Sequence, residues 1–222
     1  MIPKLYACII TAVSSANKNL KSAGYIITGQ LVRKVCLKES IVVELIGAVA
    51  AHPDPSLVRE VVLTLSCILH HNKVQQLPAA AVELLLQEEF RLALALANQK
   101  SDISGLIGQL VLSVVRMSFS SGVAPARAQP LLELPDLPSH VTASFSDTYF
   151  ELYFGADAAT RSSAAVRLMG EMLAATFSSE IQTTFQAFHS KGCDMTVLEG
   201  LKSLILGRYL GNEASQKLLE IR

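Results

Sequence analysis

Apolar residues recur at spacings of three and four along most of the chain, and strict alternation of apolar and polar positions is rare. This pattern predicts amphipathic helices, because side chains three and four residues apart share one face of an α-helix. Proline and glycine fall mainly between the periodic segments, where they end helices and form turns. The sequence therefore predicts an all-α fold.

Three pairs of helices are predicted in residues 1–119. They cover residues 2–15 and about 20–37, then 39–52 and 56–71, then 79–98 (with a break near Gln87) and 103–119. The pairs start near residues 2, 39 and 78, and such a recurrence is typical of solenoids with two helices per repeat. Because one pair cannot bury its apolar face alone, neighbouring pairs stack into a continuous core. We therefore predict an α-solenoid of HEAT-like antiparallel helix pairs.

Polar residues ahead of the predicted helices are candidates for N-caps, since their side chains accept hydrogen bonds from the first backbone N–H groups. The candidates are Asn17 or Asn19, Ser56, and Ser101 or Asp102.

The second half of the chain is predicted to begin with a connection. Residues 120–144 contain Pro125, Pro130, Pro135 and Pro138, which exclude a long helix, so we expect an exposed Pro-rich connection. Helical repeats are then predicted over residues 145–222, with helices at 145–155, 158–177, 179–189, 195–210 and 213–221 and with stops at Gly192 and Gly211. The aromatic residues within 145–154 predict a core layer, and a peptide-binding stripe is the alternative.

Charge is distributed unevenly along a chain whose net charge is zero. Residues 1–38 carry six basic residues and no acidic one, so this stretch is +6 and the remainder is −6. In the second predicted helix, a core stripe is expected from Leu20, Ala23, Ile27, Leu31 and Val35. At about 100° per residue, Lys18, Lys21 and Arg33 then lie on the opposite face.

The basic face formed by Lys18, Lys21 and Arg33 is the candidate partner-binding site. It is either a solvated outer face or a contact for phosphates or an acidic protein. Three contacts to single-stranded RNA give a slope of only about −2 in log K against log salt concentration. A net charge of zero and an aromatic content of 6% also argue against an independent nucleic-acid binder. We therefore expect this face to contribute to binding within a larger assembly.

The sequence predicts no membrane span. The longest charge-free apolar stretches, between Lys4 and Lys18 and between Asp102 and Arg116, have thirteen residues each, whereas a spanning helix needs about 18 or more. Lys4 and the apolar residues 5–13 are similar to a secretory signal peptide, and a first buried helix is the alternative. The last predicted helix runs to the end without a stop signal, as expected for a piece of a longer protein.

Motifs for catalysis and for metal or cofactor binding are missing from the sequence. It contains neither a phosphate-binding loop that ends in Gly-Lys-Ser/Thr nor a Gly-x-Ser-x-Gly nucleophile elbow. His70 and His71 are adjacent, so on a helix they point about 100° apart and do not chelate one ion. The cysteines lack Cys-x-x-Cys spacing, and we expect Cys8, Cys36 and Cys67 to be reduced thiols packed in the core. We therefore expect no enzyme, no cofactor, no metal and no small-molecule substrate.

The N-terminal part of the chain carries a resemblance to a known family. It is closest over Ile2-Pro3-Lys4-Leu5, Ala7-Cys8-Ile9 and Leu20-Lys21-Ser22-Ala23-Gly24-Tyr25, and it is looser over Pro55-Ser56-Leu57-Val58, Leu65-Ser66-Cys67 and Asp102-Ile103-Ser104. These segments resemble the family of nucleolar HEAT repeat-containing protein 1, a component of the small-subunit processome that associates with U3 snoRNA. The resemblance does not extend beyond Ser120.

The resemblance implies a non-catalytic scaffold of ribosome biogenesis in the nucleus, within the nucleolus. Members of the family are very long α-solenoids that support pre-18S rRNA processing and transcription of rRNA by RNA polymerase I. Their partners are processome proteins and pre-rRNA or snoRNA in a large ribonucleoprotein. The chain is far shorter than such a protein, so we expect it to be a fragment. A generic α-solenoid adaptor in transport or signalling, and a small secreted helical protein, are the alternatives.

Overall fold

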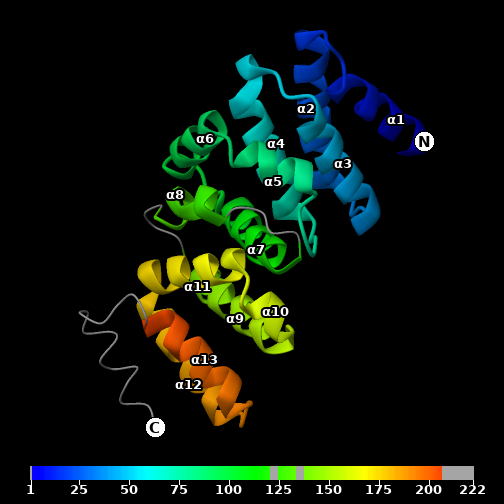
Figure 1. Ribbon diagram of the computed structural model, residues 1–222. Helices are drawn as coiled ribbons and strands as arrows, with labels where there is room; N and C mark the ends of the chain where they lie inside the picture. Colours follow the sequence, from blue (N-terminus) through cyan, green and yellow to red (C-terminus); the bar gives the residue numbers. More distant parts are fainter. Residues whose placement is uncertain (1, 121–124, 134–137, 207–222) are drawn as a thin grey trace. The chain divides into compact units, whose positions relative to one another are not determined.

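The computed structural model of the chain describes residues 2–120, 125–133 and 138–206 (Figure 1). All regular elements in these ranges are helices, as the sequence predicts. The chain divides into two compact units between Leu110 and Val111, within the helix α7, and each unit is described by itself.

The first unit contains α1 to α6 and the beginning of α7. The bounds of these helices are Ile2–Val13, Lys18–Lys34, Glu39–Ala51, Val58–His71, Ala79–Leu85, Glu88–Asn98 and Ser104–Ser120, with the 3₁₀ turn η1 (Pro55–Leu57) ahead of α4. The predicted starts near residues 2, 39 and 78 are confirmed by α1, α3 and α5. The predicted break near Gln87 separates α5 from α6.

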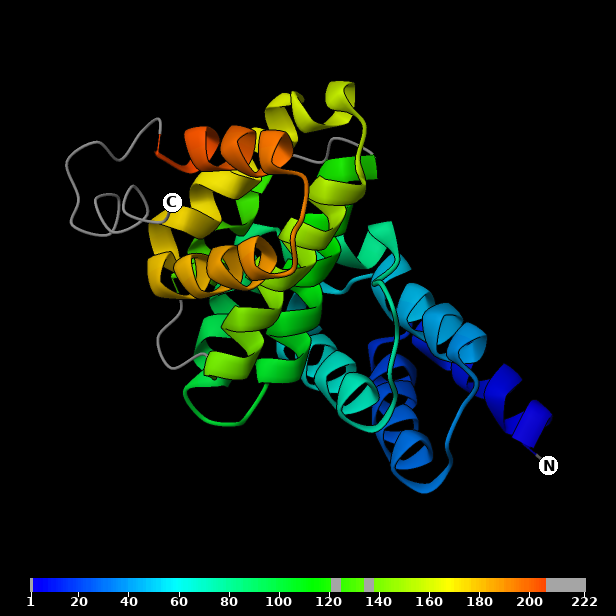
Figure 2. The same ribbon diagram turned by 90° about the horizontal axis from the view of Figure 1, so that it is seen from below.

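Helices of the first unit pack in pairs and in two rows. α1 contacts α2, α3 contacts α4, and α5 contacts α6. In addition, α1, α3 and α5 contact one another in succession, as do α2, α4 and α6 (Figures 1 and 2). The core between α3 and α4 consists of side chains that are at most 1% exposed, namely Val42, Leu45, Ile46, Val49, Val61, Val62, Leu65 and Ile68. Because each such side chain contributes about 1.5–3 kcal/mol when buried, the stacking of neighbouring helices stabilises this unit.

Acidic and amide side chains cap the N-termini of several helices. Asn17 caps α2 by accepting hydrogen bonds from two backbone N–H groups of its first turn, and Asp102 accepts one from the first residue of α7. The expectation that Ser56 caps its helix is wrong, because Ser56 lies inside η1, which Asp54 caps, and α4 begins after Leu57 without a side-chain cap. The Asp54 carboxylate accepts hydrogen bonds from the hydroxyl and the backbone N–H of Ser56. These bonds lower the pKa of Asp54, since they favour the charged form.

The second unit is organised around α11. It contains the end of α7, η2 (Pro125–Ala128), α8 (Gln129–Leu132), α9 (Ser139–Gly155), α10 (Ala158–Arg161), α11 (Ala164–Thr176), α12 (Ser178–Ser190) and α13 (Met195–Leu206). α11 contacts η2, α8, α9, α10, α12 and α13. Its Met169 and Leu173 side chains are fully buried. The predicted helix over 158–177 is therefore two helices, α10 and α11.

The expectation of an exposed connection over residues 120–144 is wrong for its described parts. These parts form η2, α8 and the beginning of α9, and they bury Pro125, Ala128, Leu131 and Leu132. The reason is that Pro125, Pro130 and Pro138 stand at helix beginnings, where the missing N–H group costs nothing and the fixed φ angle is favourable. Pro125 begins η2, and Pro138 directly precedes α9.

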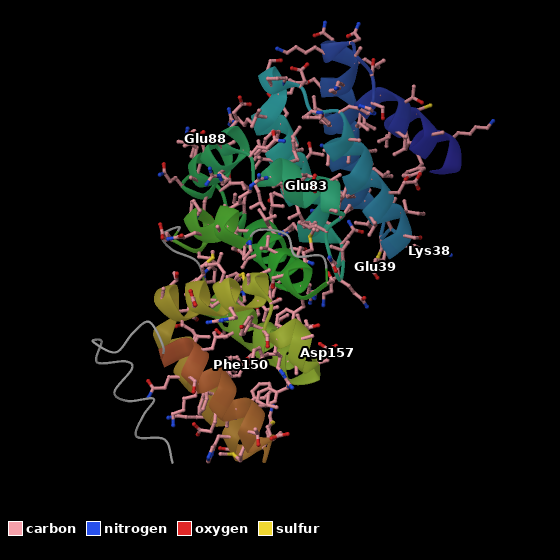
Figure 3. The ribbon with its side chains drawn as sticks, viewed as in Figure 1. Lys38, Glu39, Glu83, Glu88, Phe150 and Asp157 are labelled. Atoms are coloured by element: carbon pink, nitrogen blue, oxygen red, sulfur yellow. The ribbon has the colours of Figure 1, made fainter. Side chains whose placement is uncertain are left out.

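The aromatic residues of α9 form a core layer, as predicted. Phe145, Tyr149 and Phe150 are fully buried. The ring of Phe150 lies 6.4 Å from that of Phe185 and 5.5 Å from that of Phe188, both on α12 (Figure 3). Such aromatic pairs contribute about 0.5–1.5 kcal/mol beyond their buried area, so they hold α9 against α12.

The predicted helix stop at Gly192 is confirmed. Its φ angle is +70°, a left-handed conformation that glycine adopts without a steric penalty, and α12 ends at Ser190. Gly211, the end of the predicted helix over 195–210 and the predicted helix over 213–221 lie outside the described residues.

Gly170 allows α11 to pack closely against its neighbours. A Cβ atom at this position would lie 2.8 Å from Cζ of Tyr149, nearer still to the hydroxyl of Tyr149, and 3.0 Å from Cδ2 of Leu204. The Tyr149 hydroxyl donates a hydrogen bond of 2.9 Å to the backbone oxygen of Val166. Any side chain at residue 170 therefore displaces a fully buried ring together with its hydrogen bond.

Gly170→Ala is expected to lower the free energy of unfolding of the full chain by about 2 kcal/mol, because overpacking outweighs the higher helix propensity of alanine. Chemical denaturation followed by circular dichroism measures this change. Gly200→Ala on α13 is the matched control, because its Cβ would meet only the Tyr153 hydroxyl at 4.0 Å. This control should be neutral or stabilising by up to about 1 kcal/mol. Equal losses in the two variants would contradict the packing argument.

Candidate partner-binding surface

The helix α2 presents a different face to the core from the one predicted. Its buried residues are Lys21, Gly24, Tyr25, Thr28, Leu31 and Val32. Of the predicted stripe only Leu31 is buried, whereas Leu20, Ala23 and Ile27 are exposed. At 100° per residue the buried face is rotated by roughly 90° from the predicted one. This rotation decides which side chains of α2 can meet a partner.

The close approach of α1 accounts for this orientation. A Cβ atom on Gly24 would lie 3.0 Å from Ala12 Cβ and 3.0 Å from the backbone nitrogen of Val13. Glycine therefore permits a contact between the two helices that any larger residue would strain. Thr28 also faces this interior, and its hydroxyl is satisfied because it donates a 2.8 Å hydrogen bond to the Gly24 carbonyl.

Lys21 is a structural residue rather than part of an exposed face. It is only 6% exposed, and its Nζ donates a hydrogen bond of 2.7 Å to the backbone oxygen of His52. His52 follows the last residue of α3, where the helix dipole favours a cation. The prediction that Lys21 shares an exposed basic face with Lys18 and Arg33 is therefore wrong, because its long stem reaches through the core to the end of α3.

Lys18 and Arg33 are both exposed, near opposite ends of α2. At 1.5 Å per residue they lie about 22 Å apart along the helix axis, so they cannot hold one phosphate together. Between them α2 exposes Leu20, Ile26 and Ile27. At about 100° per residue Arg33 shares its side of α2 with Ile26, whereas Lys18 points away from Leu20 and Ile27. The use of these exposed side chains by a partner stays a prediction.

A groove of about 380 Å³ lies between α2 and α4. Ile26 and Leu63, which are 65% and 38% exposed, line it from the two helices. Gly29 and Cys67 line it as well, and the Cys67 thiol donates a weak hydrogen bond of 3.7 Å to the Gly29 carbonyl. Burial raises the pKa of Cys67, although Arg33 acts in the opposite direction. We refer to these side chains, with Tyr25, as the α2–α4 groove.

The Tyr25 hydroxyl is a buried polar group of this groove without a hydrogen-bond partner in the described part of the chain. Burial, together with the smaller effects of the Asp54 and Glu60 carboxylates, raises the pKa of Tyr25 to about 12. The phenol therefore stays protonated at neutral pH. A buried hydroxyl left unpaired costs free energy, so a bound group that accepts its proton is favoured.

The cysteines are less buried than predicted. Cys8 and Cys36 are exposed and Cys67 is half-buried, and all are free thiols. Cys8 is exposed because α1 turns Ile9 and Val13 inward instead, and Cys36 lies beyond the end of α2.

His70 and His71 do not point towards a common position. The rings of His70 and His71 are nearly perpendicular, with an interplanar angle of 83°. Within the described ranges, no group of three His, Cys, Asp or Glu side chains is placed to hold a metal ion. None of the described helices combines the length and the apolar character that crossing a membrane requires.

Lys21→Glu is expected to lower the free energy of unfolding by more than about 3 kcal/mol, because it places a carboxylate in the core against the negative end of α3. Lys18→Glu makes the same change of charge at the first residue of α2. It should alter stability by less than about 0.5 kcal/mol, since an exposed acid suits a helix N-terminus. Thermal unfolding of the two variants measures the difference, and similar midpoints would show that Lys21 has no structural role.

Comparison with known families supports the resemblance seen in the sequence. The family model for U3 small nucleolar RNA-associated protein 10 matches residues 1–114, which is more than half of the 222 residues. The match covers α1 to α6, most of α7 and the whole α2–α4 groove. It confirms the family resemblance recognised in the N-terminal segments. No curated protein matches the chain.

Proposed function

Because this chain belongs to the family of U3 small nucleolar RNA-associated protein 10, we propose that it is a non-catalytic scaffold of the small-subunit processome. The family implies a role in ribosome biogenesis and pre-rRNA processing, and it implies the nucleolus as the location. It is a family of processome scaffold components that is not known as catalytic. In the proposed role, the chain supports maturation of pre-18S rRNA and transcription of rRNA by RNA polymerase I.

The two rows of helices in the first unit suit such a scaffold. Successive contacts within each row are what stacked repeats require, because each repeat buries its apolar face against the next. We propose that these rows belong to a HEAT-like α-solenoid. A solenoid presents a long surface, so partners are held by many weak contacts along it rather than by one pocket.

The exposed apolar side chains of Ile26 and Leu63 in the α2–α4 groove, with Arg33 on the same side of α2 as Ile26, are the single observation that carries the proposed mechanism. Ile26, Ile27 and Leu63 leave apolar surface in water, which is typical of a protein interaction site. Lys18 and Arg33, which are exposed near the two ends of α2, favour a partner with acidic groups. Glu60 lines the groove itself, so the acidic groups of the partner lie towards these cations and not beside Glu60. We propose that the α2–α4 groove binds an acidic amphipathic segment of a processome protein, and that Lys18 and Arg33 contact its carboxylates.

A generic adaptor in transport or signalling remains the second candidate, since the same groove fits it. The family match favours ribosome biogenesis. The identity of the proteins and RNA that the chain binds distinguishes a processome scaffold from a transport or signalling adaptor.

Recovery of U3 snoRNA from nucleolar extract by the tagged full chain tests the proposal. Ile26→Asp combined with Leu63→Asp should lower this recovery by about tenfold or more, because carboxylates cannot be buried against an apolar partner without a large cost. Reverse-transcription PCR of U3 snoRNA and pre-rRNA provides the measurement. Both positions are exposed, so circular dichroism should show an unchanged fold.

Met195→Asp is the control, because Met195 is 48% exposed on α13 of the second unit. It should retain U3 snoRNA recovery. Absence of U3 snoRNA with the unaltered chain would contradict the processome function, and recovery of transport or signalling complexes instead would favour the adaptor. Full recovery by the double variant would reject the α2–α4 groove as the docking site.

A further inference from the structure

A second concave site lies in the second unit, outside the residues that match the family. Its volume is about 450 Å³, within the range of small-ligand sites. Four helices or helix ends contribute to it: Tyr153 from α9, Arg161 from α10, Arg167 from α11, and Thr196, Gly200 and Ser203 from α13. Figure 3 labels Asp157, which precedes α10 and caps it. We refer to this site as the arginine pocket.

The lining of the arginine pocket is positively charged. It includes two arginines, and none of its described lining residues is acidic. Acidic side chains at the neighbouring helix ends are engaged elsewhere. Asp157 accepts a 2.7 Å hydrogen bond from the backbone of α10, Asp194 accepts one of 2.9 Å from the backbone of α13, and Glu199 pairs with Lys202. The two guanidinium groups are therefore available to an anion.

Tyr153 brings the two arginines to one place. The guanidinium carbon of Arg161 lies 5.9 Å from the centroid of the Tyr153 ring, a cation–π contact that restrains the side chain. Burial raises the pKa of Tyr153, while Arg161 and Arg167 both lower it. Both guanidinium groups are thus within electrostatic reach of the same hydroxyl.

The wall formed by α13 leaves space in front of that hydroxyl. A Cβ atom on Gly200 would lie 4.0 Å from it, so glycine keeps the opening wide. Thr196 and Ser203 add hydroxyl groups to this wall, and Val197 and Leu204 add apolar surface. The pocket therefore offers cations, hydrogen-bonding hydroxyls and an apolar side within one volume.

From this geometry we propose that the arginine pocket binds a phosphate group of single-stranded RNA. The planar guanidinium groups of Arg161 and Arg167 donate paired hydrogen bonds to phosphate oxygens. The hydroxyls of Thr196 and Ser203 contact the remaining phosphate oxygens or the ribose, as serine and threonine commonly do at nucleic-acid backbones. The apolar side of the pocket lies against the attached nucleoside.

The choice of RNA over a phosphorylated protein rests on the proposed function. A volume of 450 Å³ has room for a nucleoside beside the phosphate, and the apolar residues Val197 and Leu204 suit the face of a base better than the polar N–H and C=O groups of a peptide backbone. A single phosphate held by two arginines supplies modest affinity, in keeping with one contact among many along a scaffold.

Arg161→Gln combined with Arg167→Gln tests the site in the purified full chain. The probe is a fluorescein-labelled single-stranded RNA of twelve nucleotides, followed by fluorescence anisotropy. The double variant should bind about tenfold more weakly at low salt, since hydrogen bonds to charged groups are lost. Its slope of log K against log salt should fall in magnitude by about 0.7, because one phosphate of a single strand is no longer neutralised.

Arg59→Gln combined with Arg127→Gln is the matched control. Both arginines are exposed, neither lines the arginine pocket, and the loss of charge is the same. RNA binding by this control should change by less than about twofold. A second variant, Gly200→Glu, adds a carboxylate to the wall of the pocket without removing a contact, and it should also weaken RNA binding. This variant tests the site even if the double arginine variant fails to fold.

If both double variants bound RNA equally weakly, the loss would follow from the lower net charge alone, and the arginine pocket would be rejected as the binding site. If a phosphoserine peptide bound more tightly than the RNA, and if this binding were lost in the same double arginine variant, the ligand would be a phosphoprotein and the RNA proposal would be wrong. No RNA binding by the unaltered chain would overturn the proposal as well. Because the assay contains only purified components, such a failure is distinguishable from loss of U3 snoRNA recovery in nucleolar extract, which tests the function itself.

Discussion

The contact between α1 and α2 at Gly24 is the constraint on which the candidate surface depends. Because Gly24 has no side chain, α1 approaches the backbone of α2 closely. This contact turns Lys21, Tyr25 and Thr28 into the interior, where Lys21 and Thr28 find hydrogen-bond acceptors. The opposite side of α2 is then directed away from the core with Leu20, Ile26 and Ile27 exposed. The apolar character of the partner-binding surface is thus a direct consequence of close helix packing on the other side.

Glycine has a comparable function in the second unit. Gly170 lets the Tyr149 ring lie against α11, and α11 in turn contacts α9, α10 and α13, the elements that line the arginine pocket. The position of Arg167 therefore depends on a core contact one turn further along the same helix. Both candidate binding sites are surface features whose geometry is determined by a buried glycine, so their side chains are placed by rigid helices rather than by loops.

Periodicity was sufficient to predict the helices and the starts of the first three pairs, because helix formation follows local spacing. It was insufficient for the face of α2, since a helical projection counts a lysine as polar although its stem can cross a core and its ammonium group can bind a helix end. The prolines of residues 120–144 were interpreted as breaks, whereas several of them begin helices. Arg161 and Arg167 carry no sequence signal of a shared site, because Tyr153 and α13 bring them together only in the folded unit.

The location of Cys67 has a practical consequence. Its half-buried sulfur lines the α2–α4 groove against the backbone of Gly29, whereas Cys8 and Cys36 are exposed elsewhere. An occupant of the groove covers this sulfur and leaves Cys8 and Cys36 open to alkylating reagents, while Cys193 is half-buried in the second unit. The native chain therefore contains both a chemical reporter of occupancy and internal reference thiols, and mass spectrometry can follow the engagement of this scaffold without an added label.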